Sequence, residues 1–203
     1  MTTIGTLALQ GDFHEHEAML RRLGVDTRQV RSAHDLSGLD GLIVPGGEST
    51  TFCKLMQDFD LYEPLGAVVR SGVPTWGTCA GMIVLANHAT DLEYPTLQAI
   101  DIEVSRNAYG RQVESFESDL DVPALGDAPF HGVFIRAPVV QSVGPNVEVL
   151  ATATDGSSPP SPVAVRQDSV MATSFHPELT DDDRLHRYFL DIVRRSDSGG
   201  AGK

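Results

Sequence analysis

Cysteine, lysine and long apolar runs are all scarce in this chain of 203 residues. The only cysteines are Cys53 and Cys79, too few for the disulfide framework of a secreted protein, so we predict a cytoplasmic protein. No apolar run approaches the roughly 20 residues that cross a bilayer. The N-terminal apolar run also lacks the preceding basic residues of an export signal. We therefore expect neither a membrane protein nor a secreted one.

Positive charge is scarce as well. The chain has 15 lysines and arginines against 28 aspartates and glutamates, which gives a formal net charge of −13. Such a chain repels a phosphate backbone, so nucleic acid is not an expected partner. Aromatic residues make up only 6% of the sequence and hydrophobic residues 41%. These values are ordinary for an α/β protein.

Apolar runs alternate with helical patterns in the first half of the chain. Strands are predicted at 4–9, 25–30, 39–44 and 73–76, and helices at 12–23, 51–58 and 65–70. This alternation predicts a flavodoxin-like, three-layer α/β fold with a mostly parallel central sheet. Further on, extended segments dominate at 97–104, 113–116, 131–135, 147–153, 163–166 and 170–174, before a closing helix at 185–193. We expect a β-rich excursion over 97–175, a single domain over 1–195 and a flexible tail over 196–203.

The stretch from Val73 to Ala86 organises the rest of the chain. It reads VPTWGTCAGMIVLA, so that Cys79 lies on a turn between Gly77 and Gly81. A cysteine between a buried strand and a helix has the arrangement of a nucleophile elbow, with sulfur in place of the usual oxygen. The N-terminal end of the following helix favours a thiolate there. A buried structural cysteine is the alternative on these residues alone.

A thiol nucleophile needs a base, and His176 is the best candidate among the histidines. It ends an apolar strand, and Pro177 keeps Glu178 close to its imidazole. This pair would lie at the carboxyl edge of the sheet, where open α/β folds place their sites. His131 is expected to be partly buried, with no acid near it in sequence. The histidines expected at the surface are His14, His16, His34, His88 and His186.

The segment Pro45–Ser49 supplies a third part of a possible site. Its two glycines can point backbone N–H groups outward, so that Gly47 and Ala80, the residue after the cysteine, form an oxyanion hole. The segment could instead bind a phosphate, but it lacks the lysine of a P-loop. A structural anion-binding turn also stays open.

These motifs together resemble a known family. GTCAG at 77–81, FHPE at 175–178 and PGGES at 45–49 are similar to the class I, triad-type glutamine amidotransferases. The motifs LALQG at 7–11, RNAYGRQVESFE at 106–117, FIRAP at 134–138 and TSFHPELT at 173–180 narrow the match. From residue 4 to about residue 195, the chain resembles the glutaminase subunits of pyridoxal 5′-phosphate synthase.

The resemblance implies both a site and a partner. Cys79 matches the nucleophile, His176 the base and Glu178 the orienting acid. The residues that match positions at the L-glutamine pocket are Gly46, Gly47, Glu48, Arg106, Ile135 and Arg136. No cofactor and no metal are implied. The released ammonia would pass to a lyase subunit that builds pyridoxal 5′-phosphate from a pentose phosphate and a triose phosphate, within a hetero-oligomeric complex.

A few residues depart from the pattern of the family. Asp12, Phe13 and His14 are more polar than the family pattern, and we expect them not to touch the site. Gln10 is a candidate for the partner surface.

The chain could also be an amidotransferase for another synthase, or a catalytically silent subunit that holds an assembly together. A cysteine peptidase or a chaperone-like relative is disfavoured, because neither would carry the distant FHPE motif.

Overall fold

The computed structural model describes residues 2–106, 115–154 and 160–199. A seven-stranded sheet in the order β10-β11-β12-β4-β3-β1-β2 forms its centre. The strands are β1 (Thr3–Leu7), β2 (Asp26–Val30), β3 (Gly41–Val44), β4 (Thr75–Thr78), β10 (Glu148–Ala153), β11 (Ser161–Gln167) and β12 (Val170–Thr173). The pairs from β12 to β2 are parallel, and only β10 and β11 join antiparallel. The predicted mostly parallel sheet is confirmed.

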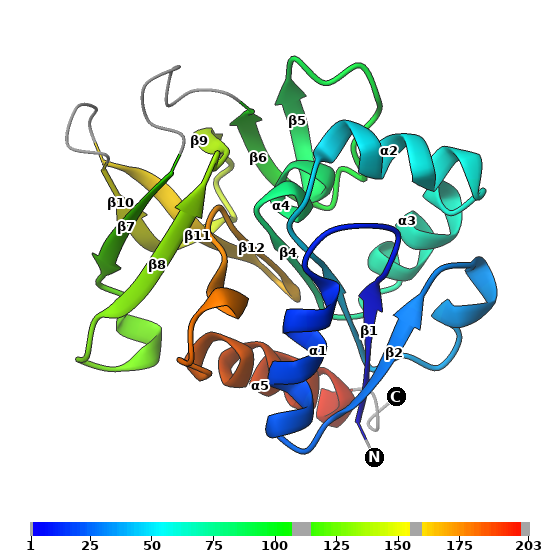
Figure 1. The fold of residues 1–203 in the computed structure, drawn as a ribbon, viewed down its shortest axis with the longest axis horizontal. Coiled ribbons are helices and arrows are strands. Elements are labelled where there is room, and N and C mark those ends of the chain that lie inside the picture. The colour runs from blue at the N-terminus through cyan, green and yellow to red at the C-terminus, as the bar shows by residue number, and fades with distance from the viewer. Residues whose placement is uncertain (1, 107–114, 155–159, 200–203) are drawn as a thin grey trace.

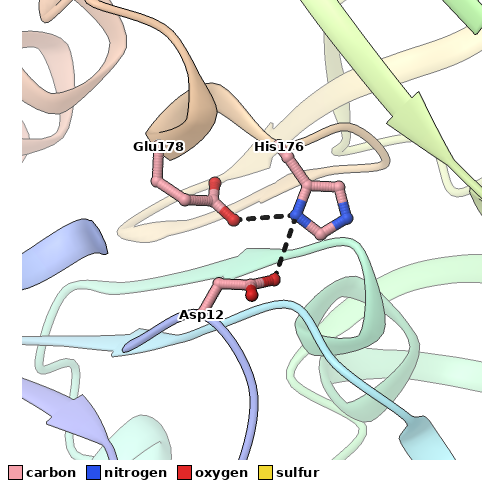
Figure 2. Close-up of side chains that lie close together, drawn as sticks. All are labelled: Asp12, His176 and Glu178. Carbon is pink, nitrogen blue, oxygen red and sulfur yellow. Dashed lines mark hydrogen bonds and ion pairs between the residues drawn. The ribbon is translucent and has the colours of Figure 1, made fainter. Parts of the chain in front are cut away.

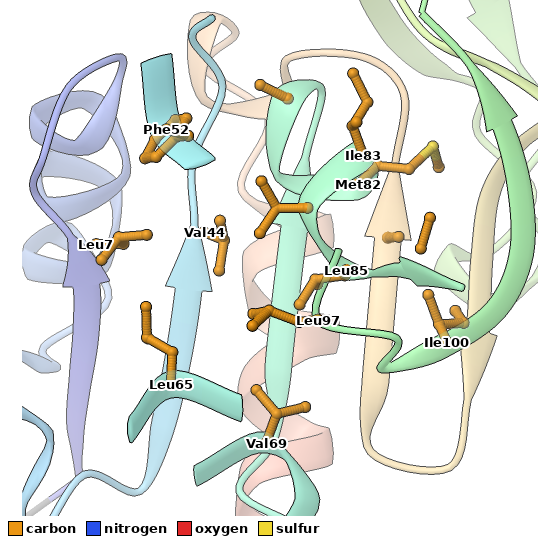
Figure 3. Close-up of a cluster of buried hydrophobic side chains, with 14 of the residues drawn as sticks. Leu7, Val44, Phe52, Leu65, Val69, Met82, Ile83, Leu85, Leu97 and Ile100 are labelled. Atoms are coloured by element: carbon orange, nitrogen blue, oxygen red, sulfur yellow. The ribbon is translucent and has the colours of Figure 1, made fainter. Parts of the chain in front are cut away.

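Helices cover both faces of this sheet (Figure 1). They are α1 (Phe13–Arg22), α2 (Ser49–Asp58), α3 (Tyr62–Arg70), α4 (Ala80–Leu85) and α5 (Arg184–Gly199), with single 3₁₀ turns η1 (Ala33–Leu36), η2 (Pro123–Leu125) and η3 (Pro177–Leu179). In β3, Val44 packs into one buried cluster and Ile43 into another, because alternate side chains of a strand point to opposite faces. The first cluster lies under α2, α3 and α4 (Figure 3), and the second under α1 and α5. The three predicted layers are therefore present.

The β-rich excursion predicted over 97–175 is divided in the structure, because β10, β11 and β12 complete the central sheet and only the segment before them forms, with β5, two small sheets beside it. One has the order β5-β6-β9 and the other pairs β7 with β8. Their bounds are β5 (Ala86–Thr90), β6 (Ile100–Ser105), β7 (Ser115–Leu120), β8 (Phe130–Ile135) and β9 (Val139–Val143). Strands β5 and β9 are not among the predicted elements. Both carry exposed polar positions, such as His88 and Gln141, so neither has the apolar run that marks a buried strand.

Three helix ends differ from the prediction by two residues or more, and one of them is the start of α3, which lies at Tyr62 rather than residue 65. Helix α2 begins at Ser49 rather than residue 51, because Glu48 acts as its N-cap and accepts hydrogen bonds from the backbone of Thr50 and Thr51. Helix α5 continues to Gly199, so residues 196–199 of the expected flexible tail are helical, and 200–203 lie outside the described residues. Among the described residues, no helix has both the length and the apolar character needed to cross a membrane.

Candidate active site

Cys79 occupies a strained turn between β4 and α4. Its φ of 47° and ψ of −106° lie where side-chain-bearing residues are rarely found. The neighbouring strands hold this conformation in place. The Cys79 N–H donates to the carbonyl of Thr173 at the end of β12, at 2.8 Å. On the other side, Gly81 lies against the Val44 carbonyl of β3. The turn therefore has the geometry expected of a nucleophile elbow.

A substitution at Gly81 should disturb this turn. A Cβ at that position would stand 1.9 Å from the Val44 carbonyl oxygen, which belongs to the backbone of a central strand and cannot move aside. We expect Gly81→Ala to lower the free energy of unfolding by about 2–4 kcal/mol in chemical denaturation. Gly66→Ala in α3 is the control, because its Cβ would meet only the flexible end of Arg70. Equal stability of the two variants would contradict this packing.

His176 and Glu178 form the acid–base pair beside the elbow (Figure 2). The imidazole Nδ1 lies 2.8 Å from Glu178 Oε1, and both residues are buried. Burial lowers the pKa of His176, but hydrogen bonds to Cys79 and Glu178 and the charges of these groups outweigh it and raise the pKa to about 10. Burial also raises the pKa of Glu178. His176 is therefore placed beside Cys79 with a carboxylate behind it, as a base that takes the proton of a thiol requires.

Asp12 also reaches His176, which corrects the expectation that residues 12–14 do not touch the site. Its Oδ2 lies 3.4 Å from His176 Nδ1, and its side chain is 39% exposed (Figure 2). The loop after β1 packs backbone to backbone on the loop after β3, where the Asp12 N–H donates to the Gly46 carbonyl. Gly11 makes this approach possible, since a Cβ there would meet the same carbonyl at 1.8 Å.

A cavity of about 330 Å³ opens over Cys79. It is lined by Asp12, Gly47, Glu48, Ser49, Cys79, Ala80, Ile83, Arg106, Ile135, Arg136 and His176. Two candidate residues lie behind this lining. Gly46 packs against the His176 ring, and Glu178 is buried on the far side of the imidazole. The remaining candidate site residues thus gather around one space, although they come from distant parts of the chain.

Arg106 is already engaged at the wall of this cavity. Its guanidinium donates to Glu48 Oε1 at 3.0 Å, to Thr50 Oγ1 at 2.9 Å and to the Asp91 carbonyl at 2.7 Å. Motif residues 107–114 lie outside the described residues, and 115–117 begin β7. Partial burial of Glu48 opposes its ionisation, but hydrogen bonds from Thr51 and Thr50 lower its pKa. Arg106 therefore ties the segment after β6 to the N-terminus of α2.

Gln10 braces the loop that carries Gly47. Its Nε2 donates to the Glu48 carbonyl at 3.1 Å, and its Oε1 accepts from the Glu48 N–H at 3.3 Å. Gly47 lies directly against the Gln10 amide and has a φ of 150°. Gln10 thus contacts the predicted oxyanion loop. Its expected role at a partner surface stays a prediction.

The predicted burial of three histidine side chains was wrong. His16 and His186 are fully buried rather than at the surface. Each has apolar residues three, four and seven positions further on, and this helical spacing could have indicated that the histidine lies on the buried face of its helix. His131 is exposed and bonds to Asp119 and Glu117, which belong to the facing strand and therefore lie close only after folding.

One group of potential metal ligands occurs among the described residues. It consists of Asp12, His176 and Glu178, whose ligand atoms lie within 4.8 Å of one another. The imidazole Nδ1 at its centre already bonds to Glu178. The group therefore has the arrangement of a proton-handling pair with a second carboxylate at its edge.

The elbow and the neighbouring His-Glu pair indicate a triad glutamine amidotransferase. A solved structure described as "Crystal structure of glutamine amidotransferase" agrees, with a TM-score of 0.85, 52% identity and coverage of 94% of this chain and 98% of its own. A putative GMP synthase component from Thermoplasma acidophilum has the same fold at 20% identity and a TM-score of 0.71, covering 99% of this chain and 98% of its own.

Residues 6–195 match the model of the SNO glutamine amidotransferase family, and the chain belongs to that family. Similar curated proteins carry the name "Pyridoxal 5'-phosphate synthase subunit PdxT". The one from Nocardia farcinica is 55% identical over 95% of this chain and 86% of its own length. The one from Carboxydothermus hydrogenoformans is 52% identical over 94% of this chain and 97% of its own.

Proposed function

We propose that this chain hydrolyses the side-chain amide of L-glutamine to L-glutamate and ammonia, as the glutaminase subunit of a pyridoxal 5′-phosphate synthase. The observation that carries the proposal is that Cys79 and His176 line the same cavity, with Glu178 Oε1 2.8 Å from His176 Nδ1. The PdxT relatives, 52–55% identical over almost the whole chain, support the choice of synthase. Lyase activity belongs to the partner subunit.

The reaction begins at Cys79. His176 holds the proton of the thiol, and the thiolate attacks the carboxamide carbon of glutamine to form a tetrahedral intermediate. The N–H groups of Gly47 and Ala80 stabilise the oxyanion. The imidazolium then gives its proton to the departing ammonia, which leaves a thioester on Cys79. Water, activated by the neutral imidazole, attacks the thioester carbonyl and releases glutamate.

The other cavity residues bind the amino-acid end of glutamine. Arg106 and Arg136 are the cations available to its α-carboxylate, and the backbone of Ile135 can accept from its α-ammonium. Gly46, Gly47 and Glu48 shape the wall opposite them. Because Arg106 already shares a hydrogen bond with Glu48, its charge is held in place before the substrate arrives.

Replacing Arg106 should weaken glutamine binding more than it slows the chemistry. Loss of a charge-assisted hydrogen bond costs about 1.5–3 kcal/mol, so Arg106→Gln should raise KM for glutamine by roughly tenfold to a hundredfold. Arg70→Gln, on the exposed face of α3, is the matched control. The measurement is steady-state glutamate release over a range of glutamine concentrations. An unchanged KM would remove Arg106 from the substrate site.

The chain's free thiols support the cytoplasm as the place where it acts, since Cys53 and Cys79 are both unpaired. We also infer that the ammonia passes to the synthase subunit instead of escaping to solvent. The decisive experiment measures glutamate release with and without that subunit, and follows ¹⁵N from the glutamine amide into pyridoxal 5′-phosphate. Absence of glutamate in both conditions, with an intact complex, would overturn the proposal and favour a scaffold.

A further inference from the structure

A row of buried polar side chains continues behind the catalytic pair, on the side away from Cys79. Glu178 Oε1 bonds to His176, while its buried Oε2 has no hydrogen bond within the part of the chain that the structure describes. His16 Nε2 lies 3.4 Å from that oxygen. His16 Nδ1 is in turn 3.0 Å from His186 Nε2. His16 and His186 are both inaccessible to solvent.

We infer that His16 is a positioning residue for the reaction. Its Nε2 lies 3.4 Å from Glu178 Oε2 without a hydrogen bond between them. A proton on Nε2 therefore sets the positive end of an N–H dipole beside the carboxylate and favours the orientation in which Oε1 meets His176 Nδ1, while His186 fixes the tautomer that makes this possible. The inference rests on the proposed function for its kinetic test. It assigns a role to two side chains that the mechanism above does not use.

The hydrogen-bonding capacities select this tautomer. If His16 carries its proton on Nε2, that N–H donates to Thr78 Oγ1 at 3.2 Å and also lies near the Glu178 carboxylate, whose Oε2 is 3.4 Å from the nitrogen. Its Nδ1 then accepts from His186 Nε2–H. The other tautomer would turn a ring lone pair toward the buried carboxylate. It would also leave an N–H on His186 Nδ1, an atom with no partner among the described residues.

The surroundings keep His16 neutral and its ring fixed. Burial comes first among the effects that lower its pKa, followed by the charges of His186 and His176. Burial likewise lowers the pKa of His186, to about 3. Trp76 packs edge-on against both rings, with centroid distances of 5.5 Å to His16 and 4.9 Å to His186. A neutral, immobile imidazole can donate one hydrogen bond in one direction, as the role requires.

The position of His16 connects both halves of the triad. Thr78, which accepts its hydrogen bond, immediately precedes the nucleophile, and Glu178, whose carboxylate lies 3.4 Å from its Nε2, orients the base. His16 comes from α1, so the helix that covers this face of the sheet also braces the catalytic groups. Positioning groups of this kind change activity without touching the substrate.

The test compares His16→Phe with His16→Gln and with His14→Phe. Phenylalanine keeps a ring but removes both nitrogens, glutamine can keep a donor toward Glu178, and His14 is an exposed histidine of the same helix. In the complex with the synthase subunit, kcat of His16→Phe should fall by about tenfold to a hundredfold. Its KM for glutamine should stay within about twofold, since substrate contacts are unchanged. His16→Gln should recover most of the loss, and His14→Phe should match the wild type.

A second readout does not depend on glutamine. The alkylation rate of Cys79 by iodoacetamide at neutral pH reports the thiolate that His176 sustains. We expect it to fall in His16→Phe and to be retained in His16→Gln. Burial raises the pKa of Cys53 to about 11, so its thiol contributes little to the signal. If the wild-type protein is alkylated but releases no glutamate, that result counts against the proposed function. The positioning role of His16 is then judged from the alkylation rates of the variants alone.

Two outcomes would overturn the inference. One is a folded His16→Phe with wild-type kcat and wild-type alkylation. The other is a loss that His16→Gln does not restore, because that would show a need for the ring rather than for the donor. If His16→Phe gives no cooperative thermal transition, His186→Phe decides. Removing its Nε2–H should lower kcat by about threefold or more at unchanged KM. An unchanged kcat would refute the positioning role of His16.

Discussion

Replacing Cys79 with alanine should abolish glutamate release, whether or not the synthase subunit is present. The thiolate is the atom that forms the bond to the carboxamide carbon, and among the residues that the structure describes no other thiol lines the cavity. A nucleophile and its base act as a unit, so we expect a loss of about 10⁴-fold or more in kcat. The measurement is glutamate formation by the purified complex, followed for long enough to detect that residual rate.

The variant should keep its fold and its partner. Alanine fits the elbow sterically, although the strain of a positive φ remains. Thermal unfolding and complex formation should therefore stay close to those of the wild type. Cys53→Ala is the matched control, since Cys53 lies on the buried face of α2 and should affect stability without removing activity. Full activity of Cys79→Ala would require another nucleophile and would overturn the mechanism.

Replacing Glu178 with glutamine should cost far more activity than replacing Asp12 with asparagine. Both carboxylates approach His176 Nδ1, but Glu178 does so at 2.8 Å from a buried position and Asp12 at 3.4 Å from a partly exposed one. Charges act more strongly where water is excluded. We expect kcat to fall by about a hundredfold or more in Glu178→Gln and by less than about threefold in Asp12→Asn.

The pH dependence should separate the two carboxylates as well. Hydrogen bonds to Cys79 and Glu178, working against burial, raise the pKa of His176 to about 10. In the free site the imidazolium is therefore present below that pH and is lost as the pH rises through it. Removing the Glu178 charge lowers this pKa, so the alkaline limb of the kcat/KM profile, which reports the free enzyme, should move to lower pH. A larger shift in Asp12→Asn would identify Asp12 as the orienting acid instead.

The catalytic pair illustrates what local sequence predicts well. Gly77 and Gly81 flank Cys79, and their missing side chains are what the elbow needs, so the turn can be read from adjacent residues. Pro177 and Glu178 follow His176 directly, so their proximity requires no knowledge of the fold. The parallel strands of the first half were equally readable, because buried strands appear as short apolar runs between helical patterns.

Asp12 and His16 show what such reading could not supply. Asp12 reaches His176 only because the loops after β1 and β3 pack on each other, although the two residues lie far apart in the sequence. His16 meets His186, Thr78 and Glu178, which come from three other segments. The apolar residues that follow His16 at helical spacing indicate that it lies on a buried face, but they do not indicate which polar groups it meets there.

The sequence by itself determined the elbow, the His-Glu pair, the glycine-rich loop at 45–49 and the alternation that builds a parallel sheet. Each of these depends on steric and hydrogen-bonding preferences among residues a few positions apart. The tertiary structure alone decided which further groups join them: Asp12 at the edge of the imidazole, Arg106 on Glu48, and the two histidines behind Glu178. These contacts arise when both faces of the sheet bury their apolar side chains, since that packing brings polar groups from distant segments together. The two histidines are fully buried there and depend on neighbouring polar groups for their hydrogen bonds.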